Sequence, residues 1–143
     1  MSAFRFEKPV RFGDVDHAGI VYYPHFFHYF HVAFEELFGA GAYQRILDEQ
    51  KIGFPAVHVE CDFSRPLRYG DRALIDVSVV RLGDKSATFR YVVRTVDNED
   101  VVCAQAKITC AVVDMQTFSA VSTPAALRRL FDSFKEVEAV VDV

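Results

Sequence analysis

The sequence predicts an α+β fold in which a long antiparallel sheet wraps around one apolar helix. Three observations support this prediction: a dense apolar segment follows a proline, segments rich in Val, Ile, Thr and Phe alternate with short turns, and 51% of the residues are apolar. A length of 143 residues suits one domain, so we expect a single domain over residues 1–143.

The first expected elements are a strand, a loop and a helix. Residues 4–12 alternate apolar and polar side chains, and Pro9 places this strand at an edge or a bend because proline cannot donate a ladder hydrogen bond. Residues 13–23 are expected to form a loop. Pro24 suits the first turn of a helix, and residues 25–38 are so rich in Phe and Tyr that we expect a helix buried on most sides.

The rest of the chain is expected to be mainly β. A short polar helix is expected at 42–51, followed by strands at 55–64, 71–82, 85–97 and 100–113. Tight turns join the last three strands, so they should form an antiparallel meander. Thr123 is then expected to cap a last helix, with Pro124 at its first position.

Composition argues against several classes of protein. The net charge of −4 does not favour nucleic acid as a partner, and no apolar run of 18 residues predicts a membrane span. The first ten residues lack the apolar stretch of a secretory signal. Cys61, Cys103 and Cys110 show no CxxC spacing, so we expect reduced, buried thiols and a cytoplasmic protein.

The charges are not evenly distributed. Residues 65–95 carry seven cations against three aspartates, although the whole chain is acidic. A local basic patch of this kind can hold a small polyanion such as a nucleotide. A solvated face of a sheet explains the same pattern.

Three histidines in the predicted helix, His25, His28 and His31, have the spacing HxxHxxH. Residues three and six positions apart do not converge on one face of a helix, whereas zinc ligands must converge. We therefore expect no metal site.

The segment 12–24, FGDVDHAGIVYYP, resembles the signature of the 4-hydroxybenzoyl-CoA thioesterase family. The segment 65–71, RPLRYGD, is similar to a turn between two strands of that family. The order of the expected elements matches over residues 4–115. The resemblance implies the hotdog fold, in which an antiparallel sheet of about five strands wraps around a long central helix. It also implies hydrolysis of an acyl-CoA to free acid and CoA, without a cofactor, since CoA is part of the substrate.

The resemblance implies a catalytic role for Asp16, as nucleophile or as general base, and for the backbone N–H of Tyr23, which would polarise the thioester carbonyl. Gly19 would let the backbone approach the substrate closely. An alternative role for Asp16 is to cap its own loop, which is common for Asp near Gly.

Substrate contacts follow from the same resemblance. Arg81, Lys85 and Ser86 are expected to bind the CoA phosphates, with Arg65 and Arg68 as further cations on the preceding loop.

Two histidines are expected near the acyl group. His31 is placed near the distal end of the acyl group, where it either contacts a polar substituent or is satisfied within the helix packing. His58 is a polar residue in an apolar strand and is a candidate for the pocket. The aromatic helix favours an aromatic acyl group, although short or medium chains are also considered because a helix under a sheet must be apolar in any case.

Two other functions remain open from the sequence. One is a hotdog hydratase or dehydratase, which His17 beside Asp16 loosely suggests. The other is a non-catalytic module that binds acyl-CoA or an acyl carrier. In each case we expect a homodimer or homotetramer with a shared sheet and sites built from two chains, because an edge strand otherwise exposes unpaired N–H and C=O groups.

Overall fold

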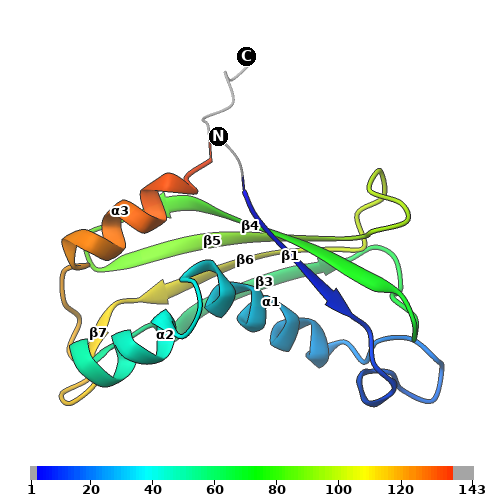
Figure 1. The fold of residues 1–143 in the computed structure, drawn as a ribbon, viewed down its shortest axis with the longest axis horizontal. Helices are drawn as coiled ribbons and strands as arrows, with labels where there is room; N and C mark the ends of the chain where they lie inside the picture. The colour runs from blue at the N-terminus through cyan, green and yellow to red at the C-terminus, as the bar shows by residue number, and fades with distance from the viewer. Residues whose placement is uncertain (1–2, 137–143) are drawn as a thin grey trace.

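A five-stranded antiparallel sheet is the framework of the computed structural model, which describes residues 3–136 (Figure 1). Its strands, in spatial order, are β1 (Phe4–Pro9), β4 (Arg72–Leu82), β5 (Ser86–Thr95), β6 (Ala104–Ala111) and β3 (Ala56–Phe63). The α+β class, the five strands and the β4–β5–β6 meander are therefore as predicted. The strand containing Pro9 is at an edge of the sheet, also as predicted.

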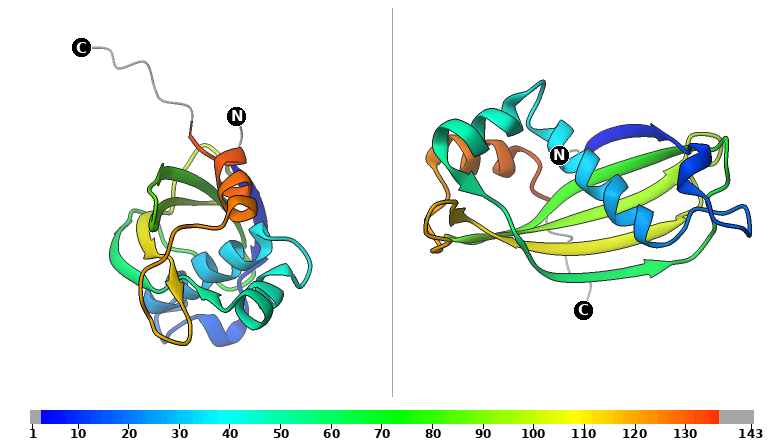
Figure 2. Two further views of the ribbon diagram at one scale, coloured as in Figure 1. Left: turned by 90° about the vertical axis from the view of Figure 1, so that its left-hand side faces the viewer. Right: turned by 90° about the horizontal axis from the view of Figure 1, so that it is seen from below.

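Helix α1 (Pro24–Leu37) runs along the concave side of the sheet (Figure 2). Its buried residues recur every three or four positions, which produces one apolar face: Phe26, Tyr29, Phe30, Ala33, Phe34 and Leu37. Rings of this face pack on the sheet, with ring centroids 5.2 Å apart for Phe34 and Phe89 and 5.0 Å apart for Phe30 and Tyr91. The opposite face is exposed within one chain. Helix α1 is therefore buried on one side only, whereas we expected burial on most sides.

The remaining elements close one end of the same face. Helix α2 (Ala42–Arg45) continues into the wide turn η2 (Ile46–Gln50), and the short strands β2 (Ile52–Gly53) and β7 (Val113–Asp114) pair with each other. Helix α3 (Ala125–Ser133) buries Leu127 and Phe131, and the Phe131 ring lies 5.2 Å from that of Phe89.

Three predicted boundaries are wrong. The strand expected at 4–12 ends at Pro9, and Phe12 begins the short helix η1 (Phe12–Asp14). The expected strand 100–113 begins only at Ala104, and its end is separated into β7. The cap of α3 is Pro124 and not Thr123. The Thr123 hydroxyl donates instead to the backbone oxygen of Asp84, at 3.1 Å, and ties the helix to the β4–β5 turn.

The three cysteines are free, with Cys103 and Cys110 buried and Cys61 half-buried. No helix of the described residues is long and apolar enough to cross a membrane.

Replacement of Phe89 by alanine should destabilise the protein by about 3–5 kcal/mol, because a large cavity would replace the ring between α1 and α3. Phe89 is fully buried, whereas Phe12 is 77% exposed. Urea denaturation should therefore show a much smaller change for the matched variant Phe12→Ala. Equal losses for the two variants would contradict this account of the core.

Candidate active site

The loop before α1 turns back on itself at Asp16. The Asp16 N–H donates to the Ile20 carbonyl at 2.9 Å, and the Gly19 N–H donates to the Asp16 carbonyl at 2.9 Å. Gly19 has a φ of +80°, which a glycine adopts without strain. The Asp16 carboxylate is exposed, and its Oδ1 accepts a hydrogen bond from the Ala18 N–H at 2.9 Å. The side chain therefore caps this turn, as in the alternative role considered for it, while its Oδ2 has no partner among residues 3–136.

A second aspartate fastens this loop to α1. Asp14 Oδ2 accepts hydrogen bonds from the buried Tyr29 hydroxyl at 2.8 Å and from the Arg11 N–H at 3.0 Å. Burial of Asp14 acts to raise its pKa, but these two hydrogen bonds, with the nearby Lys8 ammonium, hold the pKa below its usual value. The Asp14 carbonyl also accepts from the Tyr22 N–H at 3.0 Å. The start of α1 is thus held against the loop.

Tyr23 is the residue before α1 and caps its N-terminus. Its carbonyl accepts the Phe26 N–H at 3.1 Å, but its own N–H has no partner among the described residues. The N-terminus of a helix carries unpaired N–H groups and a partial positive charge. This position can therefore stabilise a developing oxyanion.

A cavity of about 310 Å³ lies beside Tyr23. It is lined by Ile20, Val21, Tyr23, Phe26, Phe63, Ser64, Arg65 and Pro66. Arg65 is exposed and forms no ion pair with the described residues, so a cation lies at the same cavity as the free N–H of Tyr23. Asp16 does not line this cavity, but its hydrogen-bonded partner Ile20 does.

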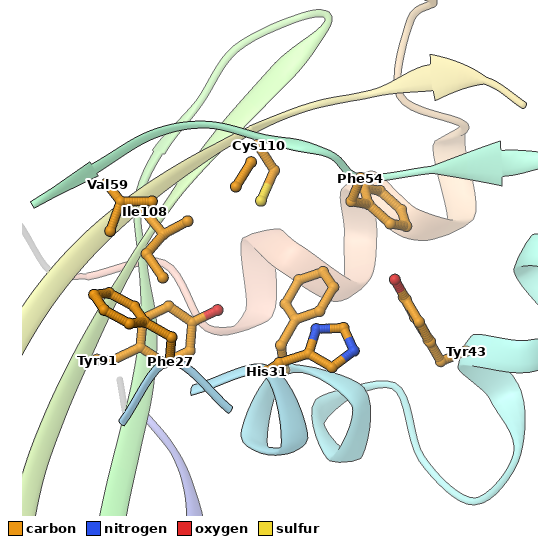
Figure 3. Close-up of a pocket in the computed structure, with 10 residues that line it drawn as sticks. Phe27, His31, Tyr43, Phe54, Val59, Tyr91, Ile108 and Cys110 are labelled. Carbon is orange, nitrogen blue, oxygen red and sulfur yellow. The ribbon is translucent and has the colours of Figure 1, made fainter. Parts of the chain in front are cut away.

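A second cavity of about 340 Å³ lies further along α1 (Figure 3). Its lining comes from α1, α2, β3, β5, β6 and the segment between β2 and β3: Phe27, His31, Phe34, Tyr43, Phe54, Ala56, Val59, Tyr91, Ile108 and Cys110. His31 is in this wall, and its Nε2 lies 2.7 Å from Glu35 Oε1. Its place near the acyl group stays a prediction. Burial raises the pKa of the Cys110 thiol to about 11, so the wall presents a thiol and not a thiolate.

His58 is not part of either cavity. It follows an irregularity in β3 and pairs with Thr109, while its neighbour Val59 lines the second cavity. Successive side chains of a strand point to opposite faces, so His58 points away from α1, and its side chain is 66% exposed. Within one chain the geometry does not support the pocket role expected for His58.

The residues expected to bind CoA phosphates are far from Asp16 in the same chain. Arg81, Lys85 and Ser86 are at the β4–β5 turn, beside α3, whereas the Asp16 loop is at the other end of the sheet (Figure 1). With 11 residues in β4, these ends are about 35 Å apart. Arg68, which bridges to Ile20, is instead next to the loop.

Sequence reasoning missed Tyr91 and Cys110 as residues of the second cavity. The alternation of buried and half-buried residues along β5 would have placed Tyr91 on the same face as Phe89 and Val93, but not at a cavity. Which core positions border empty space depends on packing between elements distant in sequence.

Comparison with known proteins shows the family of the chain. The model of the thioesterase-like superfamily matches residues 10–131. The 1,4-dihydroxy-2-naphthoyl-CoA hydrolase of Rippkaea orientalis is 30% identical over 114 residues, which cover 78% of this chain and 83% of that protein. The enzyme of the same name from Nostoc punctiforme is 30% identical over 124 residues, which cover 85% and 82%.

Solved structures of thioesterases have a similar fold. A thioesterase superfamily protein from Jannaschia sp. has a TM-score of 0.85 at 28% identity and covers 95% of each chain. A gentisyl-coenzyme A thioesterase has a TM-score of 0.77 at 28% identity and covers 90% of this chain and 98% of its own.

The chain therefore belongs to the thioesterase-like superfamily. This confirms the predicted class of enzyme, a thioester hydrolase, and the predicted hotdog relationship. The resemblance to the 4-hydroxybenzoyl-CoA thioesterases is confirmed only at the level of this superfamily.

Replacement of Tyr29 by phenylalanine should cost about 1–2 kcal/mol at pH 7, because it removes a hydrogen bond to a partly buried carboxylate. The folded-state pKa of Asp14 is lowered, so this stabilisation is present above the unfolded pKa of about 4 and is lost as the pH falls through the lower folded value.

Urea denaturation at neutral pH and at about pH 3 should therefore show the difference between wild type and Tyr29→Phe shrinking in acid. Tyr69→Phe is the matched control, because Tyr69 is exposed and its hydroxyl makes no hydrogen bond with the described residues. A difference that is the same at both pH values would show that the carboxylate is not involved.

Proposed function

We propose that this protein hydrolyses an aromatic acyl-CoA to the free acid and CoA, at a site formed where the Asp16 turn meets the start of α1. The observation that carries the proposal is the unpaired N–H of Tyr23, which lies at the helix N-terminus and beside a cavity that also contains Arg65. The relatives that act on naphthoyl-CoA and gentisyl-CoA support the same reaction.

The Tyr23 N–H would act on the thioester carbonyl. Attack on a thioester places negative charge on the carbonyl oxygen, and one well-placed donor stabilises that charge by about 3 kcal/mol. Asp14 and Tyr29 would position this donor through the loop, without contact with the substrate.

Asp16 would supply the carboxylate of the reaction, in one of two ways. As a nucleophile, a carboxylate oxygen bonds to the carbonyl carbon, the C–S bond breaks, CoA leaves as thiolate, and water then hydrolyses the mixed anhydride. As a general base, the carboxylate takes a proton from a water molecule whose oxygen bonds to the same carbon. The C–S bond then breaks, and CoA leaves as thiolate and is protonated. In both cases Gly19 allows the turn to bring the backbone close to the substrate.

The acyl group would occupy the second cavity, along α1 from Tyr23. Its walls include the rings of Phe27, Phe34 and Phe54, which suit a flat aromatic group better than a short aliphatic chain. His31, held by Glu35, would contact a polar substituent of that group.

A second copy of the chain would complete the site. Strand β3 is the last strand in the sheet order, so one of its edges has no partner among the described residues. It also exposes three apolar side chains: Val57, Val59 and Phe63. Antiparallel pairing of β3 with its copy would cover this edge, as an exposed strand edge otherwise invites pairing.

This pairing would also explain the distant basic residues. A two-fold axis across the paired strands reverses the ends of the partner, so the partner's β4–β5 turn would lie near the Asp16 loop. Arg81, Lys85 and Ser86 would then reach the CoA phosphates of the neighbouring site, together with Arg65 of the first chain.

Replacement of Asp16 by asparagine should lower kcat by about 10²–10⁴-fold while binding of the product acid is kept. Asparagine retains the oxygen that caps Ala18, so the turn should survive. A thiol-release assay with aroyl-CoA substrates measures the loss, and the exposed Asp132→Asn, on α3, is the matched control.

The same assay separates the alternative functions. A wild-type protein that binds acyl-CoA without releasing thiol would be a binding module, and one that hydrates an enoyl thioester without releasing thiol would be a hydratase. Full activity of Asp16→Asn would contradict the role of this carboxylate.

Replacement of Val57 by lysine should weaken dimerisation by about tenfold or more, because a lysine on an edge strand opposes pairing with a second copy. Val57 is 63% exposed in the single chain. Sedimentation should give wild type twice the 16.2 kDa of one chain, or four times if dimers pair. Val96→Lys, near the end of β5, should leave the mass unchanged. A monomeric wild type would contradict the shared sheet.

A further inference from the structure

The hydroxyl of Tyr91 is a polar group in the wall of the second cavity, and the proposed hydrolysis does not use it. Tyr91 is only 3% exposed, and its ring packs on Phe30 beneath β5. Every fully enclosed side-chain nitrogen or oxygen in the described part of the chain has a hydrogen-bond partner. The Tyr91 hydroxyl has none, so it must open onto the second cavity, of which Tyr91 forms part of the wall.

The direction of this hydroxyl is visible in the structure. Figure 3 shows the Tyr91 oxygen pointing into the cavity, toward the side where His31 lies. Burial raises the pKa of Tyr91 far above its usual value, so the group keeps its proton and acts as a donor. Opposite it, His31 Nε2 lies 2.7 Å from Glu35 Oε1. With the proton assigned to that nitrogen, Nδ1 of His31 is left as an acceptor.

Apart from His31, Tyr43 and Cys110, the surroundings of this donor are apolar. Phe27, Phe54 and Ile108 line the same cavity. A ligand that fills the cavity displaces water from the Tyr91 hydroxyl, and it loses affinity unless it restores that hydrogen bond. An aromatic group without an oxygen at this place would leave the hydroxyl unpaired.

The position of the second cavity along α1 defines which part of a ligand Tyr91 and His31 contact. His31 is eight residues after Tyr23, which is about 12 Å along a helix. An acyl group whose carbonyl is at the Tyr23 N–H would therefore present its distal ring, and not the ring atoms beside the thioester, to Tyr91 and His31.

We propose that Tyr91 is a specificity-determining residue, whose hydroxyl donates a hydrogen bond to an oxygen substituent on the distal ring of a polycyclic aromatic acyl group. The proposal rests on the proposed function for the location of the acyl group. A phenolic hydroxyl fits this place because it accepts from Tyr91 and donates to His31.

The test compares two substrates and two proteins. The substrates are a naphthoyl-CoA with a hydroxyl on the ring remote from the thioester and the same naphthoyl-CoA without it. The kcat/KM ratio of the two, measured by thiol release, should favour the hydroxylated substrate in wild type. Tyr91→Phe should lower this ratio by about tenfold, the effect of one hydrogen bond, because the hydroxylated substrate loses its donor and the other substrate no longer leaves a hydroxyl unpaired.

Tyr69→Phe is the matched control and should leave the ratio unchanged, because Tyr69 is exposed and borders neither cavity. Calorimetric binding of the two free naphthoic acids to wild type and Tyr91→Phe gives a readout that does not depend on turnover. It should show the same loss of discrimination.

The outcomes separate this inference from the proposed function. If wild type hydrolyses both substrates and Tyr91→Phe leaves their ratio unchanged, the role of Tyr91 is overturned and the thioesterase remains. If wild type releases no thiol but binds the hydroxylated acid more tightly, and Tyr91→Phe abolishes this preference, the proposed reaction fails and the role of Tyr91 stands. An equal loss for both ligands would indicate damage to the cavity and would overturn the proposal.

Discussion

The packing of the aromatic face of α1 on the concave side of the sheet is the constraint on which the rest of this structure depends. Phe30 and Phe34 fix the rotation and the height of the helix against Tyr91 and Phe89. Once that packing is fixed, the N-terminus of the helix must end at the loop before it. The hydrogen bond between Asp14 and Tyr29 then holds this loop in place. The N–H group at the start of α1, which we propose as the oxyanion donor, is therefore positioned by hydrophobic burial.

The sheet covers α1 on one side only, and both cavities lie where this cover ends. Both cavities lie between α1 and the edge strand β3, where Val59 and Phe63 border them. A single chain leaves this region open and leaves Asp16 exposed. Both cavities border β3, the strand at the open edge of the sheet. A second copy paired with β3 would therefore cover the sheet edge and the proposed substrate site at the same time.

Much of the fold could be predicted from the sequence because it depends on local patterns. Alternation identified the first strand, segments rich in Val, Ile, Thr and Phe between turn residues identified the others, and Pro24 marked the start of α1 correctly. The error at the last helix has a tertiary cause. Thr123 was expected to cap the helix, but its hydroxyl donates a hydrogen bond to the backbone oxygen of Asp84, which lies 39 residues away in the chain.

The site was predictable only where it is continuous in sequence. The segment 12–24 forms a turn and a helix start as expected: Asp16 and Gly19 share one turn, and Tyr23 directly precedes α1. His58 and the β4–β5 turn could not be placed, because the face of a strand depends on its register and the end of a sheet depends on topology. Tyr91 was missed for a similar reason.

The thiol of Cys110 in the wall of the second cavity has a chemical consequence. A thiolate is a nucleophile that reacts with alkylating agents and oxidants, whereas a protonated thiol is far less reactive. Burial keeps Cys110 protonated by raising its pKa to about 11, so at neutral pH only about one molecule in 10⁴ would carry the reactive anion. The apolar lining of this cavity therefore also keeps the Cys110 thiol unreactive toward such reagents.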